Sequence, residues 1–131
     1  MGGSEDRLIY MHVIFIALTS IALSVAAQFT LKAGMSSEAV KVALAQPMSL
    51  VTAFEVLTNR FVFAGFALYG IGAVVWLGVL ARWDVSKAYP LVGVGFGLTA
   101  VVGALMGEQL TLTRVMGIVL ICTGVLLVGR S

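Results

Sequence analysis

Long uncharged runs divide the chain into apolar segments. Positions 8–31, 61–81 and 88–107 contain no Asp, Glu, Lys or Arg, and each run is long enough to cross a hydrocarbon core of about 30 Å as a helix. A fourth segment, 110–128, contains only Arg114, one turn from its start, where a long side chain reaches the headgroups. The pattern predicts an all-α membrane protein with four transmembrane helices.

The longest connection, 33–60, has a different pattern. In its second half, PMSLVTAFEVLTNR, Pro47 is placed to open a helix. The residues that follow separate into a polar face and an apolar face, which hold Ser49, Thr52, Glu55 and Asn59 on one side and Leu50, Phe54 and Leu57 on the other. This predicts an amphipathic helix in the membrane interface. A water-exposed extension of the second span is the equal alternative.

Composition agrees with a membrane protein. The chain is 60% hydrophobic and 11% charged, with a mean hydropathy of +1.09, whereas about a quarter of the residues in soluble domains are charged. Its 131 residues predict a single domain. The lone Cys122 has no partner for an internal disulfide and no His or Cys neighbour at metal-ligand spacing. With no nucleophile motif or phosphate loop either, we expect no enzyme activity, cofactor or metal. The net charge of +2, without a basic run, gives no sign of nucleic-acid binding.

Two other readings concern the N-terminal segment. A cleaved signal peptide is disfavoured because the first uncharged run exceeds the roughly 7 to 15 apolar residues typical of such peptides. A lipid anchor is also disfavoured, because Asp6 stands where a myristoylation signal has Ser or Thr. We therefore expect the first run to be a true span.

Lys and Arg residues near the predicted spans are divided evenly between the two sides of the membrane. Four spans place both termini on one side. That side carries Arg7, Arg82, Lys87 and Arg130, and the opposite side carries Lys32, Lys41, Arg60 and Arg114. Because orientation follows the bias in these residues, the tie favours neither orientation and is compatible with an antiparallel dimer.

A polar stripe runs along the end of the first span. Polar residues recur there at every fourth position, which places them along one helix face: Ser20, Ser24, Gln28 and Lys32. They predict either hydrogen bonds to a neighbouring helix or a polar lane for a ligand, and the charged last member favours the lane. On the second span, Tyr69 and Trp76 are seven residues apart; packing is the favoured role for Tyr69, whereas stacking and packing are equal alternatives for Trp76.

Glycines mark the third and fourth spans. Pairs four or seven residues apart share a helix face and allow close packing, within the chain or between subunits of a dimer: Gly93 with Gly97, Gly103 with Gly107, and Gly117 with Gly124. With Gly95 and Pro90, the glycines of the third span also lower the cost of bending.

Three segments resemble known transporters. GIVLICTGVLLV at 117–128, preceded by MGEQLTLTRVM, resembles the fourth helix of the small multidrug resistance proteins and of the wider drug/metabolite transporter superfamily. AYP at 88–90 and SVAAQFTLK at 24–32 are similar to the small four-helix, EamA-like subunits of the flippase for undecaprenyl-phosphate-linked aminoarabinose. The resemblance covers nearly all of the spans but not 33–60.

The resemblance to the drug exporters fails at one position. The first helix of the drug exporters carries an embedded Glu that binds protons and cationic substrates. The matching position in this chain is at or next to Ser24, in a run without any acidic residue. A serine hydroxyl does not titrate in the physiological range. The nearest acids, Glu55 and Glu108, lie at interface depth, and Glu108 is expected to cap a helix or to pair with Arg114. Proton antiport of cationic compounds is therefore the alternative, not the leading prediction.

The leading prediction is a flippase for an undecaprenyl-phosphate-linked sugar or a similar polyprenyl glycolipid. Neutral polar side chains exchange hydrogen bonds with a sugar without burying a charge, and cations at span ends hold a phosphate. The predicted substrate-binding residues are Ser20, Ser24, Gln28, Lys32, Trp76, Arg82, Lys87 and Tyr89. Four helices enclose too little space for a polar path, so we expect a homodimer or a heterodimer with a related small subunit, in the bacterial inner membrane. A non-transporting subunit of a membrane glycosyltransferase complex is a further alternative.

Overall fold

The computed structural model describes residues 2–131, and in this range it consists of helices and short connections, without strands. Four helical segments are long and apolar enough to cross a membrane: Gly2–Met35, Arg60–Leu80, Val85–Leu105 and Leu112–Arg130. They confirm the predicted all-α protein with four spans. The elements in chain order are α1 (Gly2–Met35), α2 (Glu38–Leu44), α3 (Leu50–Thr58), α4 (Arg60–Leu80), α5 (Val85–Ala88), the 3-10 helix η1 (Tyr89–Gly93), α6 (Val94–Leu105) and α7 (Leu112–Arg130).

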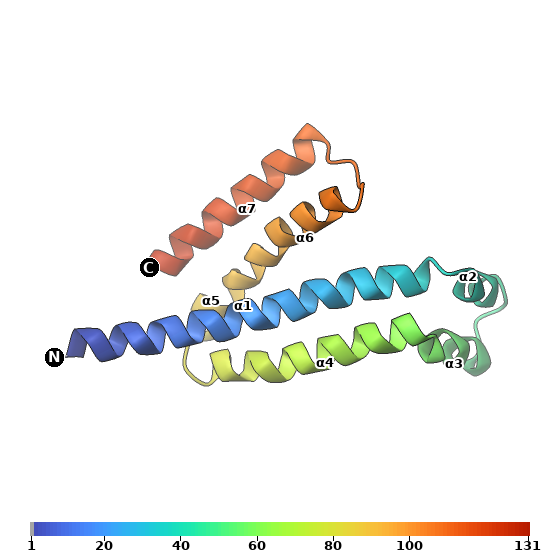
Figure 1. Ribbon diagram of the computed structural model, residues 1–131, viewed down its shortest axis with the longest axis horizontal. Coiled ribbons are helices and arrows are strands. Elements are labelled where there is room, and N and C mark those ends of the chain that lie inside the picture. Colours follow the sequence, from blue (N-terminus) through green and yellow to red (C-terminus); the bar gives the residue numbers. More distant parts are fainter. Residues whose placement is uncertain (1) are drawn as a thin grey trace.

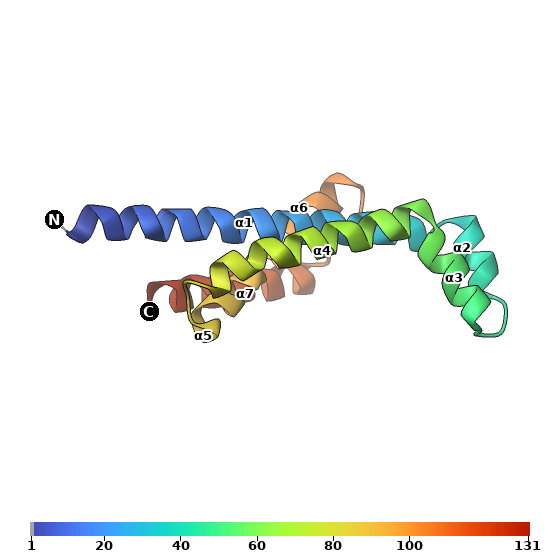
Figure 2. The same ribbon diagram turned by 90° about the horizontal axis from the view of Figure 1, so that it is seen from below.

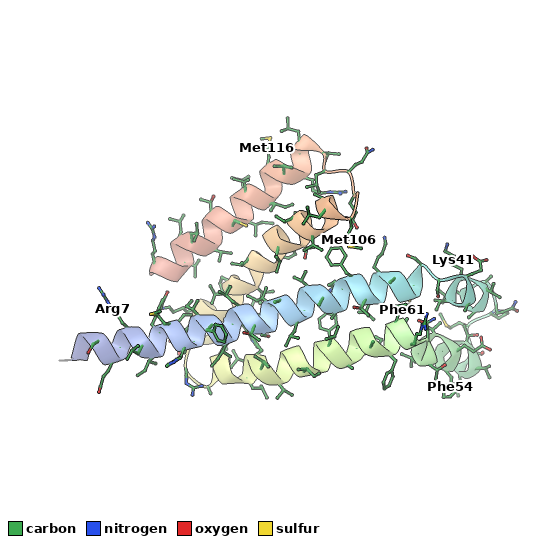
Figure 3. The ribbon with its side chains drawn as sticks, viewed as in Figure 1. Arg7, Lys41, Phe54, Phe61, Met106 and Met116 are labelled. Atoms are coloured by element: carbon green, nitrogen blue, oxygen red, sulfur yellow. The ribbon has the colours of Figure 1, made fainter. Side chains whose placement is uncertain are left out.

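Both chain ends lie at the same end of the molecule, as four spans require (Figure 1). There the Tyr10 hydroxyl donates to the Gly129 carbonyl oxygen, 3.5 Å away. Helix α1 has 34 residues, or about 51 Å, and its first turns, with Arg7, extend past the other helices (Figure 3). The span predicted from position 8 is thus the membrane part of a longer helix, because polar residues outside a bilayer do not end a helix.

Helices α1 and α4 run side by side and make the most extensive contact between any two helices described. Small residues lie at the contact: a Cβ atom on Gly34 would be 2.8 Å from the backbone nitrogen of Val62, and one on Gly65 would be 2.5 Å from Cγ of Leu31. Towards the chain termini, the same pair is completed by a buried cluster of Val13, Ala17, Val79 and Ala88. The α1–α4 pair is therefore packed along most of its length.

The third span is interrupted, contrary to the single helix predicted for 88–107. It consists of α5, η1 and α6 and ends at Leu105. Pro90 lies in η1, where it has no N–H to donate to a regular α-helix. The change of helix type falls on the segment for which Pro90 and the glycines predict a lowered cost of bending.

Helices α6 and α7 form a hairpin with fewer contacts to the other helices. A Cβ atom on Gly93 would lie 2.5 Å from Cγ2 of Val125, and one on Gly97 would lie 3.1 Å from Sγ of Cys122. These two glycines, Gly93 at the end of η1 and Gly97 in α6, therefore pack the third span against α7 within the chain. Gly117 and Gly124 have no such neighbour within 4 Å, so a role in dimer contact stays a prediction for them.

Gly107 has a conformational role instead of a packing role. It lies after the end of α6 with φ 90°, the left-handed conformation that glycine adopts without strain. The N–H of Glu108 then donates to the Gly103 carbonyl oxygen at 2.9 Å, and the Glu108 carboxylate covers Gly103. The predicted contact of Gly103 and Gly107 with a neighbouring helix is thus not formed within the described chain. Glu108 caps the helix through its backbone, while Arg114 bonds to the Gln109 carbonyl oxygen at 3.2 Å.

The connection between α1 and α4 folds into two short helices, where the sequence predicts one. Helix α3 begins after Ser49, whose hydroxyl accepts from the Thr52 N–H at 3.2 Å, so Pro47 precedes the helix and does not open it. The α2–α3 hairpin turns away from the line of α1 and α4 (Figure 2). The Asn59 amide holds it there by donating to the Ser37 hydroxyl at 3.3 Å.

Helix α3 has one polar and one apolar face, as a helix in the membrane interface requires. Thr52, on the polar face, is 4% exposed and donates to the Pro47 carbonyl oxygen. On the apolar face, Leu50 is 91% exposed and Phe54 points outward at the edge of the hairpin (Figure 3). An outward apolar face supports the predicted position in the membrane interface over a water-exposed extension.

Candidate functional site

A groove of about 670 Å³ lies between α1, α4 and the third span. Helix α1 forms one wall with Ser20, Ile21, Ser24, Val25 and Gln28. The remaining lining comes from α4, with Tyr69, Gly72, Ala73, Trp76 and Leu77, and from η1 and α6, with Tyr89, Val92, Gly95, Phe96 and Thr99. The groove is therefore built from three of the four spans, and α7 does not contribute to it.

The groove brings together most of the predicted substrate-binding residues. These are Ser20, Ser24, Gln28, Trp76 and Tyr89. The three cations assigned to a phosphate lie elsewhere: Lys32, Arg82 and Lys87 are absent from the lining. None of the described residues that line the groove is charged, so the site separates neutral hydrogen-bonding groups from the cations at the span ends.

The polar stripe of α1 divides into different roles. Ser20 is buried, and its hydroxyl donates to the Gly72 carbonyl oxygen at 2.7 Å, so this member links α1 to α4. The Gln28 amide donates to the Tyr69 hydroxyl across the same pair of helices. Ser24 is half-buried beside Gly72 and faces the groove. Ser20 and Gln28 thus match the alternative of interhelical hydrogen bonding, while all three residues also line the groove.

The other lining residues were missed or given another role at the sequence level, and three of them have side chains suited to a ligand: Tyr69, Phe96 and Thr99. Tyr69 was expected to pack, yet its ring lines the groove and its hydroxyl is bonded to Gln28. Phe96 and Thr99 complete the wall on α6. The signal for Thr99 was its spacing of four from Gly95, which places both on the face that meets α1. A Cβ atom on Gly95 would lie 3.3 Å from a methyl of Ile21.

Lys87 is held by aromatic rings near the chain termini. Its Nζ lies 5.0 Å from the centre of the Trp83 ring and 5.5 Å from that of Tyr10, and the two rings are 5.0 Å apart. Tyr and Trp are enriched at membrane surfaces, and a cation over their faces is stabilised by the ring quadrupole. This cluster therefore marks one headgroup level.

Lys32 marks the opposite headgroup level. It is exposed near the end of α1, and the rise of the helix places it about 33 Å along the axis from Tyr10. That separation matches a hydrocarbon core of about 30 Å. On α1 the groove residues run from Ser20, near the middle of this interval, to Gln28, one turn from Lys32; Tyr89 and Val92 extend the lining towards the Lys87 side.

The arrangement suits a polar but uncharged group next to an anion. Aromatic rings offer faces on which a sugar stacks, and hydroxyl and amide groups offer both donors and acceptors. The groove holds no carboxylate to exchange protons against a cation, as the drug exporters do. Its apolar walls are open to lipid, where an alkyl tail stays in the bilayer.

The chain is similar to small bacterial flippase subunits. One relative is the probable 4-amino-4-deoxy-L-arabinose-phosphoundecaprenol flippase subunit ArnF of Sodalis glossinidius, 31% identical over 123 residues, which cover 86% of each chain. Another is the probable subunit ArnE of the same kind of flippase from Pseudomonas savastanoi pv. phaseolicola, 39% identical over 76 residues, which cover 57% of this chain and 67% of the relative.

No family model and no solved structure matches the chain. The family assignment therefore rests on the relatives, whose sequence identity and coverage are sufficient for it. The chain is a multi-pass membrane protein that belongs to the family of the small ArnE and ArnF flippase subunits.

Proposed function

We propose that this protein is a flippase subunit that moves an undecaprenyl-phosphate-linked sugar, or a similar polyprenyl glycolipid, across the bacterial inner membrane. The single observation that carries the proposal is the uncharged groove between α1, α4 and α6, with Lys32 one turn beyond its end. A lipid-linked sugar has the same order of chemistry: a hydroxyl-rich head, then a phosphate, then an apolar tail. The names of the relatives describe a sugar linked to phosphoundecaprenol, with an amino group added to the head.

The sugar fits the groove and the phosphate fits its end. Ser24, Gln28 and Thr99 present hydrogen-bonding groups to the sugar, and Trp76 presents a ring face. One helical turn, about 6 Å along the axis, separates Gln28 from Lys32, so a phosphate bound to Lys32 leaves the sugar within the groove. The tail stays in lipid throughout, and only the head needs a polar path.

Lys87 is the proposed phosphate partner on the other side. It lies at the level of Tyr10, about 15 Å along α1 from Ser20, and the uncharged groove begins beyond that point. The phosphate would then pass from one cation to the other as the sugar crosses the middle of the membrane. Movement follows the gradient of the lipid, since the groove contains no titrating acid for ion coupling.

A second small subunit completes the path in this proposal. The groove has only three walls of helix, and the outward faces of α6 and α7 are apolar. A homodimer or a heterodimer with a related chain would place a second wall opposite the groove. The equal division of Lys and Arg between the two sides leaves parallel and antiparallel pairs equally compatible with the sequence.

Translocation by proteoliposomes tests the function. A labelled polyprenyl-phosphate sugar is placed on one side, and the rate of its appearance on the other is compared for the unmodified chain, Gln28→Ala and Lys32→Ala. Lys32→Ala removes hydrogen bonds to a charged phosphate, worth about 1.5 to 3 kcal/mol, and should slow translocation about tenfold or more. Gln28→Ala removes a neutral hydrogen bond to the sugar, worth about 0.5 to 1.5 kcal/mol, and should slow translocation a few times. Thr30→Ala is the matched control, because the Thr30 hydroxyl bonds to Ala26 of its own helix and lines no groove.

Three results would contradict the proposal. Normal translocation in both variants would remove the polar lane from the mechanism. Uptake of a cationic dye driven by a pH gradient, without any lipid translocation, would replace the flippase by the exporter alternative. A chain that is monomeric in detergent and binds only a membrane glycosyltransferase would instead support the non-transporting subunit.

A further inference from the structure

A second cavity lies on the other side of α1. It has a volume of about 320 Å³ and is lined by Ile9, His12, Phe15, Ile16 and Arg82. At 100° per residue, the four α1 positions centre about 140° around the helix from the groove positions. The cavity and the groove are therefore separate sites, and Arg82, predicted to serve the groove, belongs to the cavity.

Arg82 is oriented towards this cavity by its own helix end. Its Nη1 donates to the Gly78 carbonyl oxygen at 3.0 Å, which fixes the guanidinium and leaves most of its five N–H donors for another acceptor. His12 adds an imidazole from the facing turn of α1, and none of the described lining residues is acidic. Two nitrogen side chains without a carboxylate favour an anionic oxygen ligand, for which the planar guanidinium suits a phosphate.

The rest of the cavity is apolar and lies at the right depth for a lipid. Ile9 and Phe15 are 55% and 72% exposed beside the two nitrogen side chains, so an acyl chain can lie along them. Arg82 follows the last residue of α4, Leu80, by two positions and precedes the interfacial Trp83. This is the level at which phospholipid phosphates lie.

We infer that the His12–Arg82 cavity binds the phosphate of a bilayer phospholipid, whose acyl chains lie against Ile9 and Phe15. The bound lipid is resident and distinct from the transported one, because the groove lies on the opposite face of α1. It joins α1 to the end of α4 at the headgroup level. The site is independent of the proposed function: its loss would leave translocation measurable, and a failed translocation assay would leave lipid binding measurable.

Native mass spectrometry of the full chain in detergent tests the site. Phosphatidylglycerol is titrated against diacylglycerol with the same chains, which lacks the phosphate, and against a polyprenyl monophosphate. We expect phosphatidylglycerol to bind and diacylglycerol not to bind. Arg82→Gln should weaken binding about tenfold or more, because it removes charge-assisted hydrogen bonds; Arg82→Lys should weaken it less, and His12→Gln should also lower it.

Arg114→Gln is the matched control. Like Arg82, Arg114 donates to a backbone carbonyl near a span end, but it lines neither the groove nor the second cavity, so its variant should bind phosphatidylglycerol as the unmodified chain does. Equal binding by Arg82→Gln and the unmodified chain would overturn the inference. So would displacement of phosphatidylglycerol by the polyprenyl monophosphate with the same dependence on Arg82, because the cavity would then belong to the transported lipid.

Discussion

The two helix pairs of this protein differ in how much of their surface the chain itself covers. In an apolar 18-residue stretch of α1, 28% of the residues are buried, and 22% in α4, against 11% for the α5–α6 segment and 6% for α7. Hydrogen bonds follow the same division: Ser20 and Gln28 both bond from α1 to α4, whereas α6 and α7 meet through Gly93 and Gly97 against apolar side chains. Figure 1 shows α7 on the side of α6 away from α4.

The α1–α4 pair is thus the packed part of the fold, and the α6–α7 hairpin is the part whose surface the chain leaves uncovered. The α1–α4 pair has interactions that hold it in a single arrangement, and it carries two of the three walls of the groove. The α6–α7 hairpin contributes to the third wall through α6 alone and presents most of its area outward, including Leu120, Leu126 and Leu127. Lipid or a second subunit must cover that area, so changes in the first pair should act on folding and changes in the hairpin on assembly.

The largest expected effect is on folding, from Gly34→Ala. The added Cβ would lie 2.8 Å from a backbone atom of Val62, so the helices must separate, at a cost of about 1 to 3 kcal/mol. Gly70→Ala in α4 is the control, because its Cβ meets nothing within 4 Å. Thermal unfolding in detergent should show a lower midpoint for Gly34→Ala only; equal midpoints would mean that the α1–α4 contact is looser than described.

The next effect concerns assembly, from Gly124→Leu in α7. The site faces open space in the chain, so the monomer should fold normally, but a second helix packed there would be pushed away. We expect the dimer dissociation constant, from single-molecule photobleaching in vesicles, to rise about tenfold. Gly70→Leu is the control on the first pair. Dissociation by Gly70→Leu with normal dimers of Gly124→Leu would place the partner against α4 instead.

The sequence predicts the spans well and the roles of the polar stripe only in part. A segment stays in the bilayer if its own residues are uncharged, so the spans can be predicted from each stretch of sequence by itself. A spacing of four, however, turns the helix by 400°, so each member of the stripe is rotated about 40° from the last. From Ser20 to Lys32 the face turns by about 120°. Ser20 therefore lines the groove at the α4 side, where it also bonds to the Gly72 carbonyl oxygen, and Ser24 and Gln28 line it further round. Lys32 is absent from the lining because it lies one turn beyond the end of the groove, not because of the rotation.

Glycine spacing has a related limit. It identifies residues that share a face of one helix, and Gly93 does make a close contact with Val125. It does not identify the equally close contacts of Gly34 with Val62 and of Gly65 with Leu31, because these depend on how two helices are placed. Gly107, which fits the spacing, ends a helix instead. The amphipathic pattern of 47–60 likewise predicts the faces of α3 but not its start, because Ser49 caps the helix two residues after Pro47.

The smallest effect distinguishes two neighbouring serines of the stripe. Ser20→Ala removes the 2.7 Å hydrogen bond to the Gly72 carbonyl oxygen, and interhelical hydrogen bonds in membranes contribute about 0.6 kcal/mol on average. Ser24 lines the groove and has no such bond to α4 among the described residues, so Ser24→Ala should leave stability unchanged.

The two variants should therefore differ in opposite ways: one should change stability and the other should change the translocation rate. Ser20→Ala should lower the unfolding midpoint by a small amount and leave the rate of sugar-lipid translocation near normal, because its hydroxyl is already occupied. Ser24→Ala should unfold like the unmodified chain and translocate a few times more slowly, because a hydroxyl facing the sugar is lost. Equal loss of translocation in both, with no change in stability, would mean that Ser20 releases Gly72 to bind substrate and that the α1–α4 pair opens during transport.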